Sequence, residues 1–62
     1  MKTIIILDYC NAEVDIIHQV PPQDDYDNYI STVLNYDLDN IHYMVVENKI
    51  IIPNHFTPKD FN

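Results

Sequence analysis

The chain has 62 residues and a formal net charge of −7, from ten carboxylates against three lysines. A chain of this length folds as one small domain with a modest core. The negative charge disfavours binding to nucleic acid or to anionic lipid, because both depend on cationic side chains. It permits a basic protein partner, although solubility alone also accounts for such a charge.

Cysteine and histidine usage predicts neither a disulfide nor a metal site. The single cysteine, Cys10, has no internal partner, which indicates a reducing compartment. The three histidines lack the close-paired spacing of zinc modules. The apolar run Ile4 to Leu7 is too short for a secretory signal, and no run approaches the ~20 residues of a membrane span. We therefore expect a cytoplasmic protein without a cofactor.

The first half of the chain predicts a β-hairpin. Residues Lys2 to Leu7 are β-branched and aliphatic on both faces, which is typical of a strand in the middle of a sheet. The second strand, Val14 to Val20, has one half-polar face and suits a sheet edge. Its apolar face is expected to carry Val14, Ile16, His18 and Val20. Asn11 is the expected left-handed residue of the turn between the two strands.

The segment from Asp24 to Tyr36 predicts the only helix. Pro21 and Pro22 end the preceding strand, and an aspartate, Asp24 or Asp25, is expected as the N-cap. The large apolar side chains recur with the period of one helical stripe, at Tyr26, Tyr29, Ile30, Val33 and Leu34. We interpret the acidic residues at its start as capping and dipole compensation rather than as a binding site.

The last third of the chain predicts two further strands, Ile41 to Glu47 and Ile50 to Pro53. The chain contains no glycine, so asparagines are expected to take the positive φ angles of tight turns and helix ends. The expected positions are Asn11, Asn35, Asn40 and Asn48. Residues 54–62 show no period and are expected to be a mobile tail.

These elements predict an α+β fold in which residues 1–53 form a single ββαββ domain. A right-handed crossover gives a four-stranded antiparallel sheet with the order 2-1-3-4 and the helix on one face. The other face then exposes an apolar surface, from which we expect a homodimer. Side chains alternate between the two faces of the sheet, so the exposed face carries one of two sets of residues. Ile5 and Leu7 belong to one set. The other set supplies the predicted interface residues, which are Ile4, Ile6, Ile17, Met44, Val46 and Ile51.

No arrangement of residues predicts catalysis. The absence of glycine excludes phosphate-binding loops of the Walker or dinucleotide type, and Cys10 is interpreted as an ordinary turn residue. The sequence favours a small acidic protein-interaction module. The candidate partner-binding residues are Asp24, Asp25, Asp27, Tyr36, Asp37 and Asp39.

Two other classes of function stay open. One is an acidic mimic of nucleic acid that inhibits a DNA-binding protein, which needs its carboxylates in a row on one face. The other is a small ligand-binding protein or enzyme, which needs a pocket. One helix on a short sheet leaves little volume for such a pocket.

Overall fold

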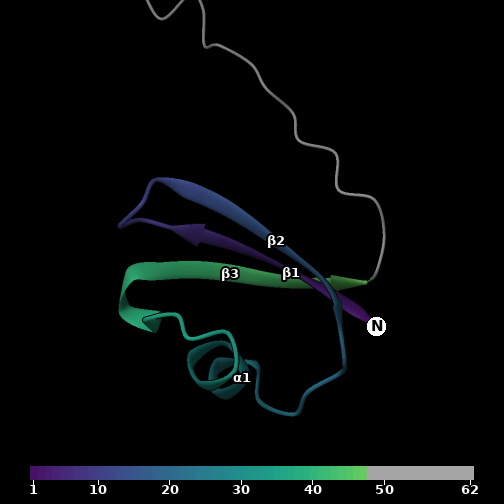
Figure 1. The fold of residues 1–62 in the computed structure, drawn as a ribbon. Helices are drawn as coiled ribbons and strands as arrows, with labels where there is room; N and C mark the ends of the chain where they lie inside the picture. The colour runs from purple at the N-terminus through teal and green to yellow at the C-terminus, as the bar shows by residue number, and fades with distance from the viewer. Residues whose placement is uncertain (48–62) are drawn as a thin grey trace, which may run out of the picture.

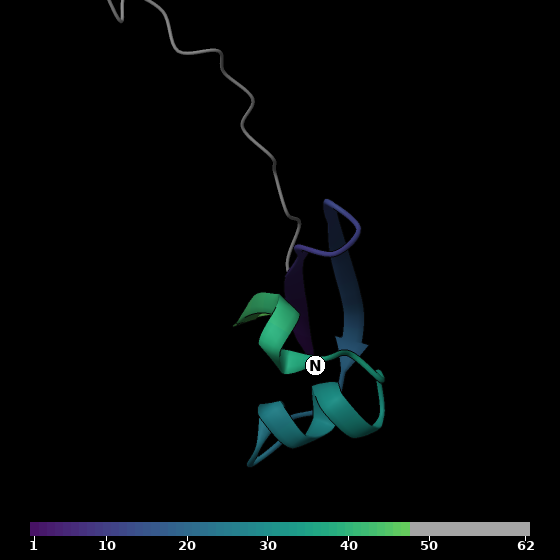
Figure 2. The same cartoon turned by 90° about the vertical axis from the view of Figure 1, so that its left-hand side faces the viewer.

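The computed structural model describes residues 1–47. Their elements are β1 (Lys2–Asp8), β2 (Glu13–Val20), α1 (Tyr26–Thr32), the 3-10 helix η1 (Leu38–Asn40) and β3 (Ile41–Glu47). The three strands form one antiparallel sheet in the order β2-β1-β3. Figures 1 and 2 both place α1 on one side of this sheet. The fold of the described residues is therefore α+β.

The predicted four-stranded sheet with the order 2-1-3-4 is wrong, because the described sheet has three strands. The α+β class and the central position of the first strand are confirmed. The predicted fourth strand, Ile50 to Pro53, and the turn at Asn48 lie outside the described residues, as does the expected tail of residues 54–62.

The core lies between the sheet and α1. Ile4 and Ile6 of the central strand are fully buried, as is Ile30 of the helix. Val20 and Ile41 complete this cluster, and half-buried tyrosines and aliphatic residues pack around it. Because β1 has a hydrogen-bonded neighbour on each side and the helix on one face, Ile4 and Ile6 are fully shielded, and Thr3 of the same strand is fully buried as well.

A β-bulge in β2 changes which residues the helix covers. The register of β2 against β1 shifts by one residue between Ile17 and Val20, and Gln19 takes a positive φ of 59° there. One extra residue moves the following side chain to the opposite face of the sheet. Val20 is consequently buried in the core together with Ile4. The prediction that Val20 shares a face with His18 is wrong for this reason.

The helix is shorter than its apolar stripe. Asp25, one of the two predicted candidates, is the N-cap, and its carboxylate accepts a hydrogen bond of 3.1 Å from the backbone N–H of Asn28. The Ser31 and Thr32 hydroxyls both donate to the Asn28 carbonyl. Such bonds compete with the regular backbone pattern, and the helix ends at Thr32. Val33 is its C-cap and is 63% exposed, so the prediction that Val33 belongs to the buried stripe is wrong.

Positive φ angles occur at three described residues, and one of them was predicted. Asn35, just after the helix, has a φ of 64° and reverses the chain as expected. The other two are Ala12, with a φ of 55°, and Gln19. Asn11 and Asn40 were also expected in this conformation and do not adopt it.

Candidate functional site

The side of the sheet opposite α1 has no other element on it within residues 1–47 (Figures 1 and 2). We call this side the open face and the other side the covered face. Strand register and alternation place on the open face Thr3, Ile5, Leu7, Val14, Ile16, His18, His42, Met44 and Val46. Most of them are aliphatic, and several large ones are exposed. Val14 is 61% exposed and Met44 is 55% exposed.

Within residues 1–47, the open face carries no carboxylate and no lysine. The same register places every Asp, Glu and Lys of the three strands on the covered face, namely Lys2, Asp8, Glu13, Asp15 and Glu47. The other described carboxylates belong to α1 and the segments that flank it, on that same side of the sheet. The described part of the molecule is therefore two-sided, with one apolar, uncharged surface and one acidic surface.

A shallow hollow of about 290 Å³ lies on the open face. Ile5, Leu7 and Met44 line it together with His42 and Tyr43. The His42 ring meets the ring of Tyr9 edge-on, with centroids 5.3 Å apart and an angle of 88° between the planes. The Tyr9 hydroxyl is hydrogen-bonded to Nδ1 of His42. The lining of the hollow is mostly apolar, so it is suited to receive a hydrophobic side chain rather than a charged ligand.

The predicted interface residues do not share one surface. Ile4, Ile6 and Ile17 lie on the covered face, where the first two are fully buried. Met44 and Val46 lie on the open face with Ile5 and Leu7, which is the other alternation that the sequence allows. Ile51 lies outside the described residues.

Two tyrosine–aspartate hydrogen bonds tie the helical layer to both edge strands. The Tyr43 hydroxyl of β3 donates to Asp27 of α1 at 2.5 Å. The Tyr36 hydroxyl, in the segment after the helix, donates to Asp15 of β2 at 2.6 Å. Each hydrogen bond to a carboxylate, helped by partial burial, raises the pKa of the tyrosine from 10.0 to about 12. We refer to these two contacts as the tyrosine tethers.

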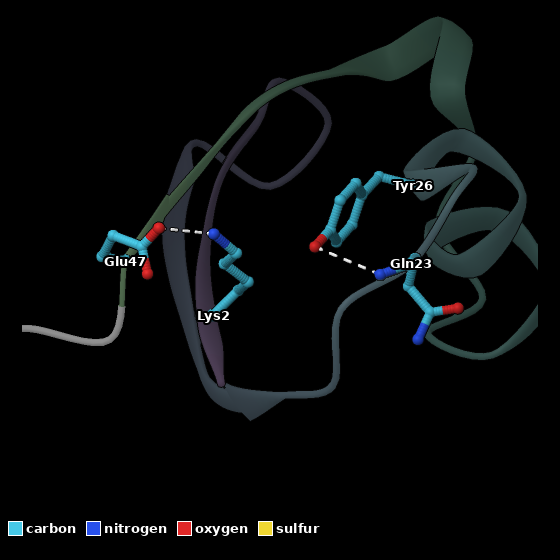
Figure 3. A network of polar contacts seen from close by, with 4 residues as sticks. All are labelled: Lys2, Gln23, Tyr26 and Glu47. Carbon is cyan, nitrogen blue, oxygen red and sulfur yellow. Dashed lines mark hydrogen bonds and ion pairs between the residues drawn. The ribbon is translucent and has the colours of Figure 1, made fainter.

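Further polar contacts lie at the end of the covered face where β1 begins and β3 ends (Figure 3). The Lys2 ammonium group of β1 forms an ion pair of 2.5 Å with Glu47 of β3, and this hydrogen bond raises the pKa of Lys2. The backbone N–H of Gln23 donates to the Tyr26 hydroxyl at 3.3 Å. Lys2 is the only lysine within the described part of the chain, so its pairing leaves the rest of the acidic surface without a basic side chain.

Most of the predicted partner-binding residues have structural roles within the chain. Asp25 caps α1, Asp27 and Tyr36 take part in the tyrosine tethers, and Asp37 caps η1 by accepting from the backbone N–H of Asp39. The interpretation of the acidic residues at the helix start as capping is confirmed for Asp25. The Asp24 and Asp39 side chains are exposed on the acidic surface.

A second, polar cleft of about 300 Å³ lies where the β1–β2 turn meets the segment after the helix. Cys10 is exposed at this cleft. Two carboxylates line this cleft, those of Asp8 and Asp37. Asp8 accepts hydrogen bonds from the backbone N–H groups of Cys10 and Asn11, at 3.0 and 3.3 Å. These bonds form the β1–β2 turn, and the positive φ falls one residue later, on Ala12. The Asp8 carboxylate already has hydrogen-bond donors, and within residues 1–47 no three metal-ligating side chains gather.

Several open-face residues of β2 and β3 were not among the predicted interface residues. Val14, Ile16 and His18 alternate along β2, and His42 follows the same rule on β3. Their alternation was visible in the sequence. The alternation pattern does not say which face of the sheet the helix covers.

No protein family model, no curated protein and no solved structure matches this chain. None of the helices in residues 1–47 has the length and apolar character needed to cross a membrane.

Proposed function

We propose that this protein is a small protein-interaction module that forms a homodimer by packing its open face against the open face of a second copy. The observation that carries the proposal is the distribution of charge. Every charged side chain of the three strands lies on the covered face, and the open face is apolar. An exposed apolar surface of this extent usually marks an interface.

Charge distribution favours a second copy as the occupant. Two molecules with a net charge of −7 each repel one another in most orientations. Stacked sheets pack about 10 Å apart, and the carboxylates would lie on the two outer surfaces of such a pair. Their separation would exceed the Debye length of about 8 Å at physiological salt. Face-to-face packing thus buries the apolar side chains and keeps the like charges screened.

The size of the open face predicts a weak dimer. Three strands spaced about 4.8 Å apart, with seven residues rising about 3.3 Å each, cover about 14 × 23 Å, or about 330 Å² in projection. The accessible area of protruding side chains is larger, and the two copies together would bury on the order of 1,000 Å², which is the lower end of specific interfaces. We expect a dissociation constant in the micromolar range, about 1–100 μM.

The experiment is sedimentation equilibrium of the full chain over about 10 μM to 1 mM, a range chosen to bracket the expected dissociation constant. We expect a rise toward twice the monomer mass of 7.3 kDa. Val14→Lys places a charge on the open face and should leave the protein monomeric. Val33→Lys is the matched control, because Val33 has nearly the same exposure, 63% against 61%, but lies at the end of α1.

Two results would refute the proposal. One is a wild-type protein that stays monomeric at every concentration. The other is a Val14→Lys variant that associates as well as Val33→Lys while both keep the circular dichroism of the folded chain. Met44→Lys repeats the test on β3, at a residue that is 55% exposed.

The acidic surface is left free by such a dimer, and we assign to it a basic protein partner. Its exposed carboxylates, such as Asp24 and Asp39, would attract arginine or lysine side chains. We place the protein in the cytoplasm, because Cys10 is an exposed free thiol and such thiols persist in reducing compartments.

A further inference from the structure

Two histidines lie on the open face, at its opposite ends. His42 of β3 is paired in register with Leu7, near the end of β1. His18 of β2 lies beside Thr3, near the start of β1, with 3.5 Å between Nδ1 and the threonine hydroxyl. Both side chains are exposed. A second copy packed on the open face would cover both rings.

Within residues 1–47, neither histidine has a carboxylate beside it on this face. His42 faces the Tyr9 hydroxyl and the hollow, and His18 faces the Thr3 hydroxyl. The other titratable residues of the three strands, which are Lys2, Asp8, Glu13, Asp15, Tyr43 and Glu47, alternate onto the covered face. An imidazolium formed on the open face would therefore be buried by the dimer without an opposite charge to compensate it.

We infer that protonation of His18 and His42 releases the dimer. The inference rests on the proposed function, since it concerns the regulation of the same surface. Burial of an unpaired cation costs far more than burial of a neutral imidazole. The monomer keeps its open face in water, where an imidazolium is solvated, so acidification favours the monomer by mass action.

The expected pH dependence is steep because each dimer buries four imidazoles. A histidine in water gains its proton below about pH 6.5. If the dimer interface accepts only neutral imidazole rings, the dissociation constant of the dimer rises about 10,000-fold between about pH 7.5 and 5.5. With one histidine removed from each chain, two imidazoles remain per dimer and the rise falls to about 100-fold.

General electrostatics predicts the opposite trend. Protonation of all three histidines changes the formal net charge of the chain from −7 to −4. Repulsion between two copies therefore weakens on acidification, which by itself would strengthen association. A dimer that dissociates as the pH falls thus identifies the histidines of the open face as the cause.

The test is sedimentation equilibrium of the full chain at about pH 7.5, 6.5 and 5.5, with circular dichroism to verify folding at each pH. We expect a dimer at the highest pH and a monomer at the lowest. His18→Gln and His42→Gln should each reduce the pH dependence, and the double variant should stay dimeric throughout. The double Phe variant serves as a second, apolar replacement and should also remove the pH dependence.

The outcomes separate this inference from the proposed function. A wild-type dimer that is equally stable at about pH 7.5 and 5.5 refutes the inference and leaves the dimer intact. Double variants that still dissociate on acidification, with His55 as their remaining histidine, refute it as well. A chain that is monomeric at every pH refutes both.

Discussion

Removal of the tyrosine tethers gives the most direct test of how the helical layer is held on the sheet. Tyr43→Phe and Tyr36→Phe each delete one hydroxyl donor and leave the ring in place. The acceptors, Asp27 and Asp15, then lose hydrogen bonds of 2.5 and 2.6 Å. Asp27 is exposed and Asp15 is half-buried, so water re-solvates the Asp27 carboxylate readily and the Asp15 carboxylate only in part.

The magnitude follows from the pKa of the tyrosines. A rise from 10.0 to about 12 corresponds to about 2.7 kcal/mol for each tether. Solvent screens a half-exposed pair, and we therefore expect each tether to contribute about 1 kcal/mol to the free energy of unfolding. For a domain of this size the double Phe variant should lower Tm by about 8–16 °C.

The tethers also predict a loss of stability at high pH. A tyrosine whose pKa is higher in the folded than in the unfolded chain stabilises the fold fully below pH 10.0, the unfolded value. That contribution disappears as the pH rises from 10.0 to about 12. The free energy of unfolding of the wild type should fall by about 2 kcal/mol across this pH window, and that of the double Phe variant should fall much less.

The assay is urea denaturation followed by circular dichroism, at neutral pH and at steps through the alkaline window. Tyr29→Phe is the control, because Tyr29 is half-buried on the same helix and its hydroxyl makes no hydrogen bond within residues 1–47. If the double variant loses stability with alkaline pH as steeply as the wild type, or if Tyr29→Phe costs as much, the tethers do not hold the helical layer.

Three further substitutions, with Asp24→Ala as the control for the cap, probe the core, the helix cap and the bulge by the same denaturation assay. Ile30→Ala should cost about 2–5 kcal/mol, because Ile30 is fully buried between helix and sheet; a cost below 1 kcal/mol would contradict this packing. Asp25→Ala should cost about 1 kcal/mol through the lost N-cap, whereas Asp24→Ala should change stability by less than about 0.5 kcal/mol. Gln19→Gly should stabilise the protein by about 0.5–1 kcal/mol, because glycine adopts the φ of 59° without steric cost; a destabilised variant would show that the Gln19 side chain matters more than its backbone.

The sequence by itself determined where the three described strands lie and where the helix begins. The third strand has the predicted bounds, Ile41–Glu47, and the first differs from its prediction by one residue, Asp8. An apolar pattern on both faces predicted that β1 is central, and it is. Asp25 was one of two predicted N-caps. These features depend on residues near in sequence, through side-chain alternation, capping and the lack of a backbone donor in proline.

Tertiary structure decided which face of the sheet became the open face. Alternation groups Ile4 with Ile6 and Ile5 with Leu7, but both groups are aliphatic and either could meet the helix. The choice depends on the bulge at Gln19, which brings Val20 to the covered face, and on contacts distant in sequence, such as Tyr43 with Asp27. A bulge inverts the alternation at one point of a strand, and no local pattern in this sequence marks that point. The composition of the open face, and with it the two histidines, was therefore settled by long-range packing.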